Sequence, residues 1–160
     1  LEDRLGAISR THDLLTDADW STAKLSDIIR EEAYPYQQED QERMRMTGPD
    51  LRLSAKEALA LGMAIHELTT NAAKYGALSV EEGHVVIGTK HDASKDANHA
   101  RIVWKEFNGP PIVSPPQRNG FGSVVIEKVL ARDLSGVVTV EYNEEGLCFQ
   151  VDFELEGTSE

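Results

Sequence analysis

The stretch HELTTNAAKYG, residues 66–76, combines a helical pattern with a row of polar side chains. At about 100° per residue, Glu67, Asn71 and Lys74 would project from a helix within one narrow stripe. The apolar residues at helical spacing fall on the opposite side: Ala58, Leu61, Ile65, Leu68 and Ala72. The stretch therefore predicts a helix that packs by one side and presents a carboxylate, an amide and an ammonium on the other.

Local signals set the two ends of this helix. Ser54 followed by Glu57 three residues later is a capping box, in which the two residues satisfy each other's free backbone N–H groups. Gly76 is typical of the residue that ends a helix. We therefore expect a long central helix from Ser54 to about Tyr75.

The polar stripe has two interpretations. It could be an ordinary solvated face with weak side-chain pairs. However, Asn71 is a costly choice in a helix interior, and the rest of this helix is dense in alanine and leucine, which leaves little free surface. The second interpretation is a magnesium and phosphate site, because a carboxylate and an amide oxygen suit Mg²⁺ and an ammonium neutralises phosphate.

Two other nucleotide or metal motifs are excluded by the sequence. A zinc peptidase helix reads HExxH, but Thr70 stands four residues after His66 and cannot replace an imidazole ligand. A P-loop requires GxxxxGK followed by Ser or Thr, and the chain contains no such stretch. Any nucleotide would therefore bind by another fold.

The other segments alternate between helical and strand periodicities. Helices are predicted within residues 1–15, around 25–29 and at 123–133, and strands at 43–47, 83–89, 101–107, 137–142 and 147–155. In the last strand the apolar residues all fall on one side, so one side of the sheet is covered and the other is wet. We expect an α/β two-layer sandwich, with a mixed, mostly antiparallel sheet covered by helices on one face.

Composition bounds the class of protein. A chain of 160 residues with 40% hydrophobic content fits one soluble domain, and a net charge of −12 disfavours nucleic acid and anionic membrane surfaces as partners. The apolar runs fall far short of the roughly 20 residues that a membrane span needs. The single cysteine, Cys148, suits a reducing cytosol, so we expect a cytoplasmic protein without membrane insertion.

Two further sequence features are weak evidence of function when each is taken alone. The segment 108–122 is rich in Gly and Pro, which predicts a functional lid loop, and its glycines at 120 and 122 lead into a helix whose N-terminus could hold phosphate. Taken alone, that glycine pair is more typical of a flexible turn. Trp104 and Glu106 lie two apart on one strand and share a face, which by itself indicates a buried aromatic and a carboxylate at the sheet edge.

The order of the motifs along the chain is more specific than any one of them. An HELxxNAxKYG helix, a W-x-E strand with N-G-P, a proline-rich loop and GFGS before a helix follow one another over nearly the whole sequence. This order resembles the ATP-binding domain of sensor histidine kinases, with the Bergerat-type fold of gyrase and mismatch-repair ATPases, and within them the HWE subfamily. The resemblance divides the chain into residues 1–30, the end of the dimerisation helices, and residues 31–160, the catalytic domain.

The resemblance implies roles for the central helix. Asn71 would coordinate Mg²⁺, and Glu67 would share in the metal site, orienting its water, or assist the phosphate acceptor. Lys74 would contact a phosphate, and Tyr75 would pack near the adenine of ATP. His66, which gives the subfamily the first letter of its name, would tune Glu67, contact nucleotide or only pack.

The resemblance also implies roles for the two glycine boxes. The first departs from the usual DxGxG, because it reads EFNGPP over residues 106–111. Within it Glu106 or Asn108 would accept the amino group of adenine, beside Gly109. Arg118 in the lid would reach the γ-phosphate. The second box would cradle the phosphates with Gly120, Phe121, Gly122 and Ser123.

The implied reaction moves the γ-phosphoryl group of magnesium ATP to a histidine on a phosphoacceptor helix of the same kinase, from which a response regulator receives it in two-component signalling. The H-R-x-K-N segment that carries this histidine in the subfamily does not occur here, and His12 sits in a different context. We therefore expect ATP binding without autophosphorylation by this chain alone. The alternatives are an ATP-driven clamp or a serine kinase with the same fold, or a binding module without catalysis.

Overall fold

The computed structural model describes residues 2–17, 22–37, 42–94, 97–111 and 121–156. The strands are β1 (Thr22–Lys24), β2 (Met44–Thr47), β3 (Arg52–Ser54), β4 (His84–Ala93), β5 (Asn98–Phe107), β6 (Val137–Asn143) and β7 (Gly146–Glu154). The α-helices are α1 (Glu2–Asp17), α2 (Leu25–Ala33), α3 (Ala55–Tyr75) and α4 (Phe121–Asp133), and two short 3₁₀ turns are η1 (Tyr34–Tyr36) and η2 (Ala77–Ser79).

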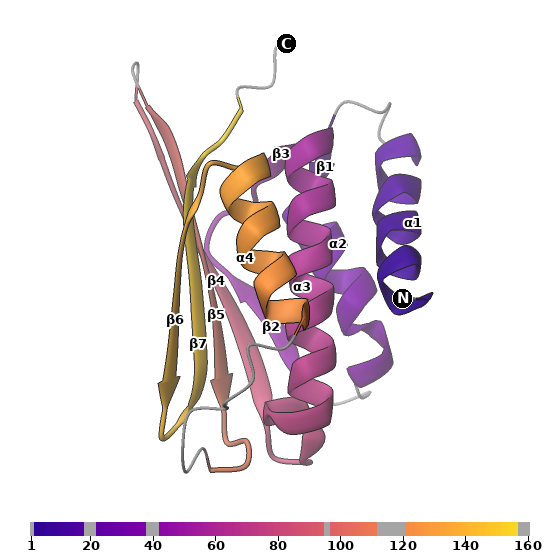
Figure 1. The fold of residues 1–160 in the computed structure, drawn as a ribbon, viewed down its shortest axis with the longest axis vertical. Coiled ribbons are helices and arrows are strands. Elements are labelled where there is room, and N and C mark those ends of the chain that lie inside the picture. The colour runs from indigo at the N-terminus through magenta and orange to yellow at the C-terminus, as the bar shows by residue number, and fades with distance from the viewer. Residues whose placement is uncertain (1, 18–21, 38–41, 95–96, 112–120, 157–160) are drawn as a thin grey trace.

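The main sheet has five strands in the order β2-β4-β5-β7-β6. β2 pairs with β4 in parallel, and the other neighbours are antiparallel. All four helices lie on one side of this sheet, with α1 farthest from it (Figure 1). The predicted two-layer sandwich with a mixed, mostly antiparallel sheet is therefore confirmed.

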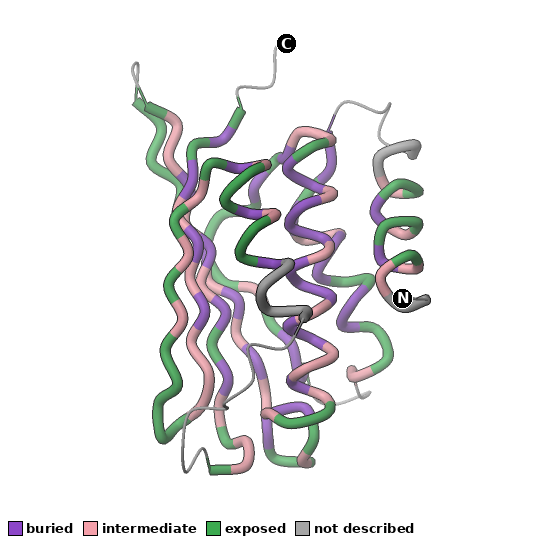
Figure 2. The backbone as a smooth tube through the Cα atoms, in the orientation of Figure 1, coloured by how far each residue is buried: buried purple, intermediate pink, exposed green. Residues whose placement is uncertain are grey.

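The core lies between α3 and the inner face of the sheet. Figure 2 shows buried residues along α3 and along the strands that face it. On α3 the predicted apolar side is buried throughout, and it joins one hydrophobic cluster with inward residues of β4, β5 and β7, including Val85, Ile87, Ile102, Trp104, Phe149 and Val151. Burying each large apolar side chain is worth about 1.5–3 kcal/mol, so this contact fixes α3 on the sheet.

The ends of α3 follow the sequence signals. Ser54 Oγ accepts a hydrogen bond from Glu57 N at 3.2 Å, and Glu57 Oε1 accepts one from Ser54 N at 2.8 Å, which is the predicted capping box. Glu57 Oε2 also accepts Glu156 N at 2.8 Å, so the same carboxylate ties the end of the chain's last strand to the start of the helix. At the other end Gly76 N donates to Ala72 O at 3.0 Å.

Several elements differ in extent from the prediction. The β4–β5 hairpin runs from His84 to Phe107, longer than predicted, because polar residues at its far end continue to pair across the strands. The ladder between β1 and β3 was not predicted, since three-residue strands carry too little alternation to detect. α4 begins at Phe121, two residues before its predicted start.

Some predictions fall outside what the structure describes or remain predictions. Residues 112–120, the larger part of the predicted lid, lie outside the described residues. The predicted boundary between residues 30 and 31 falls inside α2, and this division of the chain stays a prediction. In the described residues, no helix has both the length and the apolar character needed to cross a membrane.

Replacing Glu57 by alanine should lower the free energy of unfolding by about 1–3 kcal/mol, because the backbone N–H groups of Ser54 and Glu156 both lose their acceptor. Urea unfolding followed by circular dichroism measures the loss. Glu81→Ala removes the same charge at an exposed position and should change stability little. Equal losses in the two variants would contradict the role given to Glu57.

Candidate functional site

The polar stripe of α3 lies at the edge of the core. Glu67 and Asn71 are half-buried and Lys74 is exposed. All three face away from the apolar side of the helix, as the sequence predicts, so their groups do lie along one line of the helix surface. The structure therefore brings together a carboxylate, an amide and an ammonium on the last three turns of α3.

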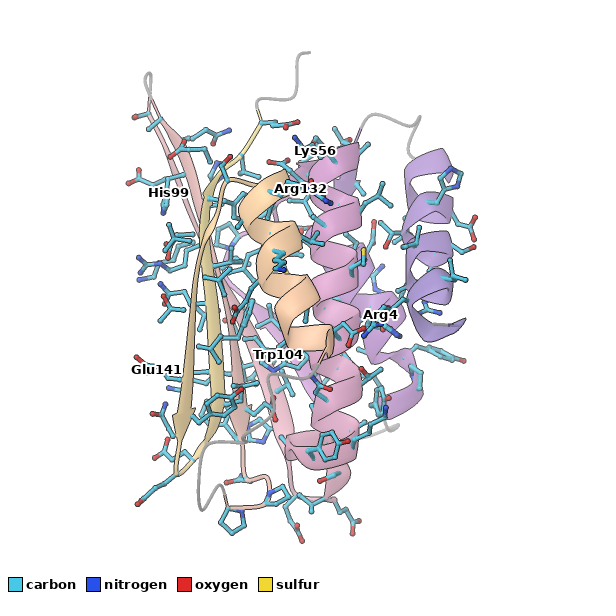
Figure 3. All side chains as sticks on the ribbon, viewed as in Figure 1. Arg4, Lys56, His99, Trp104, Arg132 and Glu141 are labelled. Atoms are coloured by element: carbon cyan, nitrogen blue, oxygen red, sulfur yellow. The ribbon has the colours of Figure 1, made fainter. Side chains whose placement is uncertain are left out.

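Glu67 already has a partner from outside α3. Arg4 of α1 donates its Nε–H to Glu67 Oε1, and the two side chains form an ion pair in which Glu67 is 12% exposed and Arg4 25% exposed. Figure 3 shows the Arg4 side chain between α1 and α3. Nothing in the sequence pattern predicts this contact, because Arg4 lies 63 residues away in the chain.

His66 points toward α1 and α2 and is 7% exposed. Its Nδ1 lies 3.0 Å from Glu32 Oε2 on α2, and Arg10 of α1 donates to Glu32 Oε1 at 3.0 Å. Because the carboxylate can only accept, we assign the proton to Nδ1, so the 3.3 Å approach of Arg10 to the same nitrogen is a contact and not a hydrogen bond. The remaining nitrogen, Nε2, is buried and has no hydrogen-bond partner among the described residues.

The partners of Glu32 set its protonation. Burial alone would raise the pKa of Glu32, but the hydrogen bonds and positive charges of His66 and Arg10 outweigh it and hold the pKa below its usual 4.5. Glu32 is therefore an anion under ordinary conditions and binds His66 and Arg10 at the junction of α1, α2 and α3. His66 therefore lies at that junction, and its three proposed roles remain predictions.

The W-x-E motif joins β5 to the end of α3. Trp104 and Glu106 are both buried, and Trp104 Nε1 donates to Glu106 Oε2 at 3.0 Å. Ala77 N, just beyond α3, donates to Glu106 Oε1 at 3.0 Å. A Cβ atom on Gly76 would lie 2.1 Å from the same oxygen, so the helix must end in a residue without a side chain. The motif thus positions the end of α3 against the sheet.

The buried environment of Glu106 disfavours the ionised form of its carboxyl group. Burial raises the pKa of Glu106 above its usual 4.5, while the hydrogen bonds from Ala77 and Trp104 act in the opposite direction. Both carboxylate oxygens have a donor, and each still has a second lone pair that could accept another hydrogen bond. Its assignment to adenine remains a prediction.

Arg43 is a positioning residue that the sequence did not reveal. It is buried, and its guanidinium donates to Gly83 O at 3.0 Å, to Ala77 O at 3.3 Å and to Val80 O. Ala77 is therefore held at its carbonyl by Arg43 and at its N–H by Glu106. An arginine at the start of a short alternating strand gives no signal that it will be buried against carbonyl groups 34 to 40 residues away.

The first glycine box passes close to this junction. Asn108 has φ of 57°, a left-handed conformation that asparagine tolerates better than most residues. A Cβ atom on Gly109 would lie 2.9 Å from Ala77 N. The backbone at Gly109 therefore lies closer to the end of α3 than a residue with a side chain would allow. The structure thus brings Glu106, Asn108 and Gly109 beside the last turn of α3, where Tyr75 is exposed.

The second glycine box is only partly described. Arg118 and Gly120 lie outside the described residues. Phe121, Gly122 and Ser123 form the first turn of α4, which packs against α3. A helix N-terminus carries free N–H groups and a partial positive charge, which suit a phosphate. These residues therefore bring a second polar element near α3.

The donor set fits a hydrated magnesium ion. Mg²⁺ prefers oxygen ligands, is usually held by only one or two protein groups and keeps several waters. Asn71 and Glu67 offer an amide oxygen and a carboxylate one turn apart on a surface that water reaches. The chain can therefore supply a magnesium site together with an ammonium from Lys74 for phosphate.

Solved structures show which fold this chain has. The histidine kinase domain of the blue-light-activated kinase EL346 from Erythrobacter litoralis superposes with a TM-score of 0.70, at 15% identity over 96% of this chain and 78% of that chain. The histidine kinase ThkA, solved in complex with the response regulator TrrA, superposes at 0.59 with 17% identity, over 95% of this chain and 49% of that chain. The fold is that of histidine kinase catalytic domains.

Sequence comparison shows which histidine kinases this chain is similar to. Residues 1–50 match the HWE histidine kinase family model. Over 149 residues the chain is 36% identical to the blue-light-activated histidine kinase of Brucella ovis, covering 93% of this chain and 30% of that protein. The chain is similar to HWE histidine kinases, as the motifs predicted, and it spans less than a third of the length of these relatives.

Lowering the pH should remove the stability that Glu32 supplies. Its depressed pKa means that its contribution is complete above about pH 5 and is lost as the pH falls through the folded-state pKa. The free energy of unfolding of Glu32→Gln should therefore lie about 1–2 kcal/mol below wild type near pH 6, and the gap should narrow as the pH falls below 4.5. Glu31→Gln, at the exposed neighbouring position, serves as the control. A gap that stays constant with pH would contradict the ion-pair assignment.

Trp104→Phe should leave the apolar packing largely in place and remove one donor from Glu106. A raised carboxyl pKa costs stability where the group is ionised, and removing the indole donor should raise the pKa of Glu106 further, so the loss should reach about 1–3 kcal/mol at pH 7 and become smaller near pH 4. Phe149→Leu, on the strand position paired with Trp104, should cost stability equally at both pH values. A pH-independent loss in Trp104→Phe would show that Glu106 does not depend on the indole.

Proposed function

We propose that this chain is the ATP-binding catalytic domain of an HWE sensor histidine kinase, and that it transfers the γ-phosphoryl group of magnesium ATP to a histidine of a dimerisation domain. The observation that supports the proposal is the stripe of Glu67, Asn71 and Lys74 on α3, a helix whose end lies against Gly109 and which contacts α4. Similarity to HWE histidine kinases supports this function over a serine kinase or an ATP-driven clamp.

The nucleotide would lie between the end of α3 and the start of α4. In this pose Tyr75 would pack near adenine, and Glu106 or Asn108 would accept its amino group. The phosphates would meet Lys74 and the N-terminal turn of α4, which Phe121, Gly122 and Ser123 form. Gly120 and Arg118 would complete the phosphate contacts from the lid.

Catalysis in such a site is mainly positioning and charge neutralisation. Bound Mg²⁺, held by Asn71 with Glu67, would neutralise the charge of the phosphate groups. Glu67 would orient the acceptor imidazole and take up its proton as a nitrogen–phosphorus bond replaces the bond from the γ-phosphorus to the departing ADP oxygen. Lys74 would balance the negative charge on the phosphates.

The partners follow from this reaction. The phosphoacceptor helix of the same kinase would present its histidine to Glu67, and a response regulator would then receive the phosphoryl group on an aspartate. The ThkA structure, in which a histidine kinase is in complex with a response regulator, supports a response regulator as a partner. The reaction would place this domain in the cytoplasm.

Asn71→Ala should weaken ATP binding roughly tenfold or more in the presence of Mg²⁺ and change it little in EDTA, because only the metal ligand is removed. Isothermal titration calorimetry with and without Mg²⁺ measures the two affinities. Asn98→Ala removes the same amide at the far end of the β4–β5 hairpin and should leave both affinities unchanged. Undiminished magnesium-dependent binding in Asn71→Ala would overturn the proposed metal site.

A further inference from the structure

Helix α1 docks on α3 through small side chains. Ala7 and Thr11 are buried, at 1% and 4% exposure, in the face of α1 that meets α3. A Cβ atom on Gly62 of α3 would lie 2.4 Å from Thr11 Oγ1. Glycine is unfavourable in the middle of a helix, yet here it is what allows the two helices to approach. The fit between Gly62 and Thr11 therefore marks a specific docking position for α1.

Two arginines of α1 fasten this docked position. Arg4 binds the carboxylate of Glu67, and Arg10 binds Glu32 at the junction with His66. The two arginines lie on either side of Ala7, so ion pairs flank the small-residue contact. Each pair is partly open to solvent, since the Arg4 and Arg10 side chains are 25% and 40% exposed.

Among the larger apolar residues of α1 whose side chains the structure describes, Leu14 is partly buried against the core and two others are exposed. Leu5 and Ile8 are 61% and 37% exposed, so they point away from α3. The interface thus combines one partly buried leucine with small side chains and solvent-screened ion pairs, each of which contributes little stability. Undocking α1 would therefore cost less than unfolding the core of the domain.

The Arg4 contact falls on the residue with the proposed chemistry. A guanidinium group paired with Glu67 Oε1 neutralises the charge of the carboxylate and competes for the oxygen atoms that would hold a metal-bound water or receive a proton. The docked helix therefore disfavours the active role of Glu67.

We propose that α1 is an autoinhibitory latch: in the docked state Arg4 withholds Glu67 from the nucleotide site, and movement of α1 releases it. This inference rests on the proposed function, because it regulates the same site. It adds that Mg²⁺ and Arg4 compete for one carboxylate, so undocking α1 should strengthen magnesium-dependent ATP binding. Binding of ATP without Mg²⁺ does not involve this competition.

Two variants release the latch by independent routes. Arg4→Met removes the guanidinium and keeps the length of the side chain. Gly62→Ala keeps both Arg4 and Glu67 and pushes Thr11 away from α3. Alanine also has a higher helix propensity than glycine, so the substitution favours α3 itself. Arg30→Met, which removes an exposed arginine paired with Asp27 on α2, is the matched control.

The experiment measures the ATP dissociation constant by calorimetry in Mg²⁺ and in EDTA, and the hydrogen exchange of α1 amides by mass spectrometry. Arg4→Met and Gly62→Ala should each speed exchange in α1 and raise the ratio of the EDTA to the Mg²⁺ dissociation constant about three- to tenfold. The double variant should gain no more than either single one, and Arg30→Met should match wild type. Circular dichroism checks that every variant is folded.

Three results would overturn the latch. A ratio that stays unchanged while α1 exchanges faster would show that docking does not control Glu67. Unchanged exchange in both variants would show that these contacts do not hold α1. Absence of magnesium-dependent ATP binding in the unmodified chain and in both released variants would overturn the proposed function as well, whereas the first two results leave it standing.

Discussion

The packing of α3 on the inner face of the sheet is the contact on which the rest of the structure depends. This helix of 21 residues is about 30 Å long, and it is the element that meets α1, α2, α4 and the β1–β3 ladder. Its apolar side is committed to the core, so the direction of its polar side is fixed at every turn. Glu67, Asn71 and Lys74 consequently have defined positions even though they lie near the surface.

The end of α3 is held by charges that the core has to accommodate. Ala77 is bound at its N–H group by Glu106 and at its carbonyl by Arg43, both of which are buried. A buried carboxylate and a buried guanidinium are costly unless their hydrogen bonds are satisfied, and here backbone groups and the Trp104 indole satisfy them. The W-x-E motif is therefore a structural joint between the sheet and the helix, whatever else Glu106 binds.

The sequence predicted those parts that depend on local patterns. The capping box at Ser54 and Glu57, the stop at Gly76 and the alternation in β7 each act within a few residues, and the structure has them where they were predicted. The convergence of the α3 stripe followed from helical periodicity alone.

The long-range contacts could not be predicted in this way. Arg4, Arg43 and Glu32 meet partners 34 or more residues away, and their own neighbours in the sequence are those of ordinary surface positions. The burial of His66 depends on where α1 and α2 pack against α3, and helical periodicity does not specify that packing. The side-by-side placement of Asn108, Gly109 and Ala77 likewise required the fold, since only the end of α3 explains why a glycine is needed there.

The parallel pairing of β2 and β4 has a consequence for how the domain opens. Two parallel neighbours need a connection that returns from one end of the sheet to the other, and in this chain α3 lies on that connection. Melting α3 would therefore also detach β2 from the sheet edge, so the stripe should belong to the most slowly exchanging cooperative unit of the domain. α1 precedes this connection, so it can unfold separately. Arg4 and Glu67 form an ion pair, yet they therefore belong to different unfolding units.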